Sequence, residues 1–301
     1  MFIHCLGAAA GGGYPQWNCA CEGCDKARKS PDLATKHAGI AVSGDGERWF
    51  LLNATPDVHH QIAADSALHP GPGVRQTPVA GVLLTDAEFD HTIGLLMLRE
   101  ESSLTVYGTY PVLDALNRTF PIRGLLSDYA EISWSVVDVD EPVELDDRLR
   151  VTAFLTGSKA PRYVGAPPGP SADRSAWEVG YRLEDTGTGG TAVYAPTLPR
   201  WDENFAEQVA SADCVFVDGT FWTDDEMSAR GAGGRTGRSM GHMPVSGEDG
   251  SAHRLAALRA RRKIYTHINN TNPVLDEDSK ERRWLTDLGI EVGRAGLEVE
   301  V

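Results

Sequence analysis

An apolar segment followed by a cluster of metal-binding side chains constrains the fold of this chain more than any other feature of its sequence. The segment Val79 to Leu84 has the length and composition of a buried strand. Four side chains able to bind a metal ion follow it closely: Asp86, Glu88, Asp90 and His91. A buried strand that delivers carboxylates and an imidazole into the turn after it is one way in which enzymes build a metal site. The sequence therefore predicts a metal site at the end of this strand.

Short apolar runs rich in β-branched residues recur along the chain, with turn signals between them. They predict strands at 3–6, 39–42, 49–52, 79–84, 104–107, 151–155, 179–183, 192–194, 214–217 and 263–266, and helices at 56–64, 111–117, 204–210 and 253–260. This arrangement predicts a layered α/β fold, which we expect to form one domain over residues 1–301. Two segments rich in Gly, Pro, Ser or Arg, 159–175 and 227–250, predict mobile loops that serve as lids or binding loops.

Charge and composition exclude several classes of function. The 28 basic and 43 acidic residues leave a formal net charge of -15, which disfavours binding to nucleic acids and to anionic membranes. The N-terminus lacks the regions of a signal peptide, and no apolar run reaches the roughly 18 residues of a membrane-spanning helix. We therefore expect a cytoplasmic protein without direct membrane insertion. Its oligomeric state stays open, a homodimer included.

Three of the five cysteines lie close together in the sequence, at Cys19, Cys21 and Cys24. Because the cytosol keeps thiols reduced, this spacing is more typical of a closed structural zinc site than of a disulfide or of unrelated thiols. The fourth ligand must come from elsewhere, and the candidates are the neighbourhood 267–270, which includes Asn270, and the pair His4 and Cys5. Cys214 lies in an apolar run and is expected in the core.

Two further apolar runs also end in a side chain of ligand type. Residues 214–217 precede Asp218, and residues 263–266 precede His267. If these strand ends meet Asp90 and His91 at one edge of a sheet, two imidazoles and one carboxylate form the ligand set of a non-haem Fe(II) enzyme. With Asp218 as a bridge, the same site could hold two zinc ions instead.

Several residues near these strand ends are candidates for supporting roles. Glu88 is interpreted as a partner that orients an imidazole, the alternatives being a metal ligand or a solvated turn residue. Asp218 could bind the metal or orient one of its ligands. His242, in a Gly-rich loop, is a candidate acid or base or else a solvated histidine. Arg235 and Arg238 could pair with substrate carboxylates or remain solvated.

Several motifs resemble a known family along essentially the whole chain. Residues 86–91 occupy the frame of the metallo-β-lactamase signature H-x-H-x-D-H, and Asp218 and His267 resemble its later ligand motifs. Longer segments resemble the coenzyme PQQ synthesis protein B family: 2–4, GGGYPQWNC at 11–19, NATPD at 53–57, VDGT at 217–220, MGH at 240–242 and HINNTNP at 267–273.

This resemblance implies an αββα sandwich with the site at the sheet edge, a zinc held by Cys19, Cys21 and Cys24, and a role in making pyrroloquinoline quinone (PQQ). The chain departs from the hydrolases of the superfamily at three places. Asp86 and Glu88 stand where those enzymes have two histidines, and residues 154–158 contain no histidine for the third motif. The ligands that remain are Asp90, His91 and His267.

The leading hypothesis is an Fe(II)-dependent, O₂-using hydroxylation of the tyrosine ring in a Glu-Tyr precursor of PQQ. A first alternative is a non-enzymatic carrier that helps to move PQQ or its precursor towards the periplasm. A second is a zinc-dependent hydrolase, which the altered first motif disfavours. Expected partners are the small peptide-derived substrate or PQQ itself, and other proteins of PQQ biosynthesis.

Overall fold

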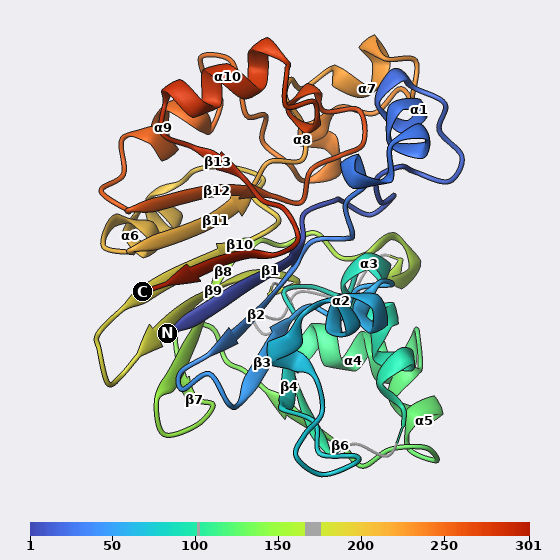
Figure 1. Ribbon diagram of the computed structural model, residues 1–301, viewed down its shortest axis with the longest axis vertical. Helices are drawn as coiled ribbons and strands as arrows, with labels where there is room; N and C mark the ends of the chain where they lie inside the picture. Colours follow the sequence, from blue (N-terminus) through green and yellow to red (C-terminus); the bar gives the residue numbers. More distant parts are fainter. Residues whose placement is uncertain (101–102, 166–175) are drawn as a thin grey trace.

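The computed structural model describes residues 1–100, 103–165 and 176–301, and two seven-stranded sheets lie face to face in this part of the chain (Figure 1). In spatial order the first sheet contains β14 (Leu297–Glu300), β1 (Phe2–Gly7), β2 (Gly39–Ser43), β3 (Trp49–Leu52), β4 (Val79–Leu83), β5 (Leu104–Gly108) and β6 (Ile132–Val136). The second contains β13 (Glu291–Val292), β12 (Arg262–Thr266), β11 (Cys214–Asp218), β10 (Thr191–Ala195), β9 (Glu178–Asp185), β8 (Leu149–Gly157) and β7 (Pro142–Glu144).

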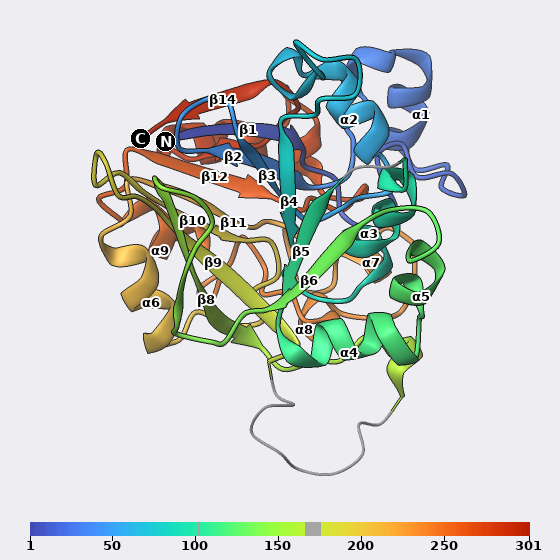
Figure 2. The same cartoon turned by 90° about the horizontal axis from the view of Figure 1, so that it is seen from below.

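Helices cover the outer faces of both sheets. The helices in the described residues are α1 (Glu22–Lys29), α2 (Val58–Ala64), α3 (Phe89–Thr92), α4 (Tyr110–Arg118), α5 (Ile122–Leu126), α6 (Glu203–Ala210), α7 (Glu226–Ala229), α8 (Gly237–Met240), α9 (Ala252–Ala256) and α10 (Lys280–Asp287). Short 3₁₀ helices are η1 (Pro31–Leu33), η2 (Ser66–Leu68), η3 (Ile93–Leu98), η4 (Arg162–Val164) and η6 (Pro273–Leu275). Helices α2 to α5 lie on one side of the sandwich, and α6 and α9 on the other (Figure 1, Figure 2). The expected αββα sandwich is therefore confirmed.

Strand β11 shows why the apolar runs become buried strands. Successive side chains of a strand point to opposite faces of its sheet. Cys214 and Phe216 lie in the core between the sheets, whereas Val215 and Val217 lie in the core beneath the helices. Because β11 is parallel to β10 and to β12 and is covered on both faces, the strand is a continuous apolar run rather than an alternating one. The predicted core position of Cys214 is confirmed.

All the strands expected from apolar runs are present. The strands and helices that are very short, exposed or mostly polar were not predicted. Strands β6, β7, β13 and β14 are exposed or very short, and the sequences of α1 and α10 are mostly polar. The helix expected at 253–260 spans only Ala252–Ala256. No helix in the described ranges is long and apolar enough to cross a membrane.

The expectation of mobile loops is corrected for residues 227–250. This segment contains α8 and most of α7, the Thr236 side chain caps α8 by accepting from Ser239 N–H, and Met243 and Val245 are buried beneath the second sheet. The high glycine content of this segment led to the prediction of a loop, because composition does not show these contacts. Of the other expected loop, residues 159–165 contain η4, and residues 166–175 lie outside the described residues.

Candidate metal centre

Three side chains from two strand ends converge at one edge of the sandwich. Asp90 and His91 lie in α3, which follows β4, and His267 follows β12 directly. One ligand atom from each of these three residues lies within 4.8 Å of the others. His267 Nε2 is 3.2 Å from Asp90 Oδ2, and His91 Nε2 is 3.7 Å from the same oxygen. The two imidazoles and the carboxylate thus form a compact donor set.

The burial of His91 shows that this donor set suits a metal ion. His91 Nε2 is buried and has no hydrogen-bond partner among the described residues. An unpaired polar atom in a protein interior is costly, and a metal ion bound at Nε2 would satisfy it. Burial, together with the nearby His91 and His242, lowers the pKa of His267 despite its contact with Asp90, which favours the neutral imidazole that metal ions bind.

Asp86, rather than Glu88, orients the His91 ring. Both carboxylate oxygens of Asp86 lie within hydrogen-bond distance of His91 Nδ1, at 2.8 and 2.7 Å. Asp86 is itself held by the Glu88 backbone N–H and by the Thr85 hydroxyl. The Glu88 side chain lines the adjacent pocket and makes no hydrogen bond to an imidazole within the described ranges, which differs from its expected orienting role. In the sequence, the position of Asp86 in the turn shortly before His91 could have indicated this orienting role.

This carboxylate also changes the proton affinity of His91. Burial by itself lowers the pKa of His91, but the neighbouring carboxylates of Asp86 and Asp90 outweigh burial and raise the pKa to about 9. Without a metal, His91 therefore carries a proton at neutral pH. A metal ion that binds at Nε2 must displace that proton.

A second set of contacts surrounds Asp218, the last residue of β11. Its carboxylate accepts from Leu198 N–H and from both the backbone N–H and the hydroxyl of Thr220, and it lies 2.7 Å from His242 Nδ1. Asp218, His242 and His267 also lie within 4.8 Å of one another. Because Asp218 already has four hydrogen-bond partners, it is placed to orient His242 more than to offer a free oxygen to a metal.

Thr220 links this second set to the first. Its Oγ1 is 2.8 Å from His267 Nδ1 and 3.1 Å from His242 Nδ1. The rings of His242 and His267 are stacked, with their centroids 5.3 Å apart. Thr220 was not predicted, although it follows the strand-end residue Asp218 by only two positions. It is placed to accept from the Nδ1–H of His267, which leaves Nε2 of that ring available as a ligand.

A pocket of about 280 Å³ opens at these histidines. Its polar lining includes Glu178, which is 5% exposed and whose pKa burial raises to about 7. Its cationic lining consists of Lys159, Arg162 and Arg235. Arg235, one of the two arginines predicted to bind substrate, is part of this lining, whereas Arg238 is not and donates to the Asp249 carbonyl. Lys159 and Arg162 were missed, although they follow the end of β8 as the metal-binding side chains follow β4 and β12.

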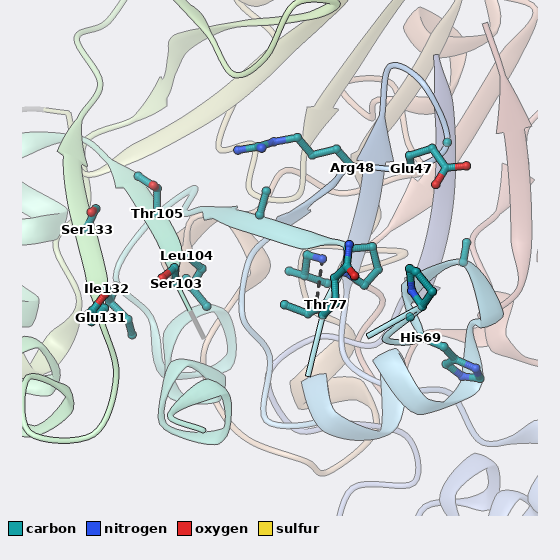
Figure 3. Close-up of a pocket in the computed structure, with 18 residues that line it drawn as sticks. Glu47, Arg48, His69, Thr77, Ser103, Leu104, Thr105, Glu131, Ile132 and Ser133 are labelled. Atoms are coloured by element: carbon teal, nitrogen blue, oxygen red, sulfur yellow. Dashed lines mark hydrogen bonds between the residues drawn. The ribbon is translucent and has the colours of Figure 1, made fainter. Parts of the chain in front are cut away.

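A larger pocket of about 930 Å³ lies at the opposite end of the first sheet (Figure 3). It is lined by residues at the starts of β4, β5 and β6, such as Val79, Leu104 and Ile132. None of the groups of metal-ligating side chains found in the described chain contributes to it. The smaller pocket, which contains the histidines, is therefore the candidate functional site.

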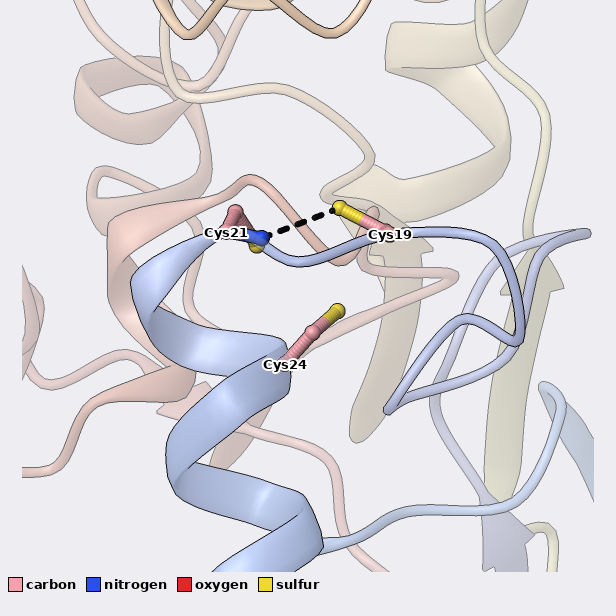
Figure 4. Close-up of side chains that lie close together, drawn as sticks. All are labelled: Cys19, Cys21 and Cys24. Carbon is pink, nitrogen blue, oxygen red and sulfur yellow. Dashed lines mark hydrogen bonds between the residues drawn. The ribbon is translucent and has the colours of Figure 1, made fainter.

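A second candidate metal site is formed by Cys19, Cys21 and Cys24 (Figure 4). The Sγ atoms of Cys19, Cys21 and Cys24 lie within 4.8 Å of one another at the start of α1. Asn270 Nδ2 lies 3.2, 3.8 and 3.4 Å from these three sulfurs, respectively. The alternative neighbours are elsewhere, because His4 pairs with Asp65 and the Cys5 thiol contacts the Gly7 carbonyl. Of the two candidate neighbourhoods for a fourth ligand, the structure brings the one containing Asn270 to the cysteines.

Comparisons with known proteins agree with the fold. A family model for the β-lactamase superfamily domain matches residues 48–268. The coenzyme PQQ synthesis protein B of Cupriavidus necator is 45% identical over 99% of this chain and 98% of its own length, and that of Azotobacter vinelandii is 42% identical over both full lengths. The crystal structure of Zn²⁺-bound PqqB from Methylobacterium extorquens matches all of both chains with a TM-score of 0.91 and 37% identity. A diphosphatase of the PhnP family shares the fold, with a TM-score of 0.69 at 18% identity.

Proposed function

The chain belongs to the coenzyme PQQ synthesis protein B family, with a metallo-β-lactamase fold and a role in PQQ biosynthesis, and we propose that it hydroxylates the tyrosine ring of a Glu-Tyr precursor with Fe(II) and O₂. A tyrosine ring must gain oxygen atoms before it can become a quinone. In each hydroxylation one oxygen atom of O₂ enters a ring C–H bond, and the other leaves as water with two electrons from a reductant and two protons.

The donor set of Asp90, His91 and His267 carries this proposal. Two imidazoles and one carboxylate with open positions are the ligand set of non-haem Fe(II) oxygenases, and the buried His91 Nε2, which has no hydrogen-bond partner in the described part of the chain, fits a metal ligand. When bound there, Fe(II) supplies the activation of O₂. A binuclear hydrolase site is disfavoured, because the carboxylate that replaces its first histidine, Asp86, is already bonded to His91.

The protein residues around the donor set have separate tasks. Asp86 fixes the His91 ring so that Nε2 faces the metal position, and Thr220 does the same for His267. His242, held through Nδ1 by Asp218, lines the pocket and is proposed to take up and return the proton of the substrate phenol.

The cationic side chains of the pocket fit the charge of the proposed substrate. The pocket lies in a chain with a formal net charge of -15, yet Lys159, Arg162 and Arg235 gather along it. A Glu-Tyr peptide carries two carboxylates, and guanidinium groups bind carboxylates with paired hydrogen bonds. We assign Arg162 and Arg235 to these carboxylates, and zinc to the three cysteines.

The test is anaerobic reconstitution with Fe(II), followed by a Glu-Tyr dipeptide, ascorbate as reductant and O₂, with mass spectrometry of the product. The expected result is a dipeptide that gains oxygen in the wild type and not in His91→Ala. A cleaved dipeptide would support the hydrolase instead. Binding without turnover, with iron occupancy verified, would support the carrier. Either of these outcomes overturns the proposal.

A further inference from the structure

We infer that Asn270 is a positioning residue through which the cysteine cluster (Cys19, Cys21 and Cys24) holds His267 in place, so that metal binding at the two sites is linked. This inference goes beyond the reaction proposed above. It uses only the two donor sets and holds whichever reaction the protein catalyses. It predicts that a metal ion in the cysteine cluster strengthens metal binding by Asp90, His91 and His267.

Asn270 is the point where the two sites meet. It follows His267 by three residues, and its Nδ2 lies within 3.8 Å of all three sulfurs of the cluster. Its carbonyl oxygen also lies 3.8 Å from the Cys21 sulfur. A metal ion in the cluster draws the three sulfurs to about 2.3 Å from itself, so filling or emptying the cluster moves the atoms that Asn270 contacts.

The segment between His267 and Asn270 is short and firmly hydrogen-bonded. Ile268 N–H donates to the Ala8 carbonyl at 2.6 Å, and Asn269 N–H donates to the Thr220 carbonyl at 3.0 Å. Asn272 Nδ2 donates to the Gly219 carbonyl at 2.9 Å. A displacement of Asn270 therefore reaches the backbone of His267 and is not absorbed by a loose loop.

His267 itself depends on such support. Its φ of 57° lies in the left-handed region, which is unfavourable for a residue other than glycine. A strained conformation of this kind persists only where the surrounding contacts determine it. Strand β12 holds His267 on one side, and the segment anchored by Asn270 holds it on the other. Loss of the anchor at Asn270 removes part of this support and lets His267 shift relative to Asp90 and His91.

The experiment measures Mn²⁺ binding at the histidine site with the cysteine cluster filled or empty. Mn²⁺ is a suitable probe of the histidine site because it prefers oxygen and nitrogen ligands, whereas thiolates prefer zinc. Protein with one zinc per chain and protein dialysed against a chelator under reducing conditions are titrated with Mn²⁺, and free Mn²⁺ is counted by electron paramagnetic resonance. His267→Ala, which abolishes the signal of bound Mn²⁺, identifies the site. Co²⁺ substitution, read by its thiolate charge-transfer absorption, confirms which site the first metal fills.

Asn270→Ala is the decisive variant, and Asn18→Ala is its matched control. Asn18 is exposed beside Cys19, and its side chain contacts Gln16 instead of the segment 268–272. In the wild type and in Asn18→Ala, removal of zinc is expected to weaken Mn²⁺ binding by about tenfold or more, as loss of an orienting partner does at other metal sites. Asn270→Ala is expected to bind Mn²⁺ weakly from the start and to show no further loss when zinc is removed.

Two results would overturn the inference. One is Mn²⁺ binding that stays within twofold of the wild type in Asn270→Ala and after zinc removal. The other is an equal loss on zinc removal in the wild type and in Asn270→Ala, which would mean that the link does not pass through Asn270. Circular dichroism and thermal unfolding show whether the variant folds. If Asn270→Ala does not, Asn270→Asp keeps the side-chain size, lacks the N–H donors and is subject to the same two criteria.

Discussion

Protons should compete with metal ions for His91, and the size of this competition follows from the structure. Burial lowers the pKa of His91, but Asp86 and Asp90 together raise it to about 9. Below pH 9 the apparent metal affinity then falls almost tenfold for each pH unit, because the metal must displace one proton. Between pH 8.5 and 6.5 we expect Mn²⁺ binding to weaken by roughly 75-fold, which corresponds to a free-energy change of about 2.5 kcal/mol.

Asp86→Asn is the perturbation that isolates this effect. Removal of one carboxylate lowers the pKa of His91, so the dependence of metal affinity on pH should flatten. At pH 8.5 the variant should bind Mn²⁺ about 10- to 100-fold more weakly than the wild type, because the ring has lost the acceptor that orients it. Asp65→Asn is the matched control: Asp65 Oδ2 lies 2.7 Å from His4 Nδ1, a similar pair away from the site.

Isothermal titration calorimetry with Mn²⁺, in two buffers with different ionisation enthalpies, measures both the affinity and the number of protons released. About one proton per Mn²⁺ is expected near pH 7.5 in the wild type and in Asp65→Asn. An affinity that stays constant from pH 6.5 to 8.5, with no proton release, would refute the reasoning. So would an Asp86→Asn variant with the pH dependence of the wild type.

Three further predictions concern the pocket and the cysteine cluster. Burial raises the pKa of Glu178 to about 7, so the folded protein retains a proton that the unfolded chain loses near pH 4.5, and the stability of the wild type falls as pH rises between these values. In urea unfolding, the free energy of unfolding of Glu178→Gln should therefore increase by up to about 3 kcal/mol relative to that of the wild type between pH 5 and pH 8. A difference between the two proteins that does not change with pH would contradict this. Steady-state kinetics with the Glu-Tyr dipeptide should show a KM raised about tenfold or more in Arg162→Ala and Arg235→Ala with little change in kcat, and equal KM values in these variants and Arg238→Ala would contradict the assignment. A chelator should lower the thermal unfolding temperature of the wild type more than that of Cys24→Ser, which already lacks one zinc ligand; equal shifts would argue against a stabilising metal at the cluster.

Much of the fold follows from local patterns that the sequence displays directly. Continuous apolar runs such as 214–217 identify strands that are buried on both faces, and the side chain after each run marks the edge of the sheet. For this reason Asp90, His91 and His267 could be named as a group before their contacts were known. Elements with few apolar residues, such as α10, carry no such pattern, because their position depends on the surface that they cover.

The sequence by itself therefore determined the layered architecture, the strand ends that carry potential ligands and the grouping of three cysteines. Only the tertiary structure decided which neighbours these residues have: Asp86 rather than Glu88 at His91, Asn270 rather than Cys5 at the cysteines, and Arg162 rather than Arg238 at the pocket. The physical reason is the separation along the chain over which each kind of interaction acts. Hydrophobic periodicity acts over a few residues, whereas hydrogen bonds and charge pairs join side chains far apart in the chain, such as the 177 positions between Asp90 and His267.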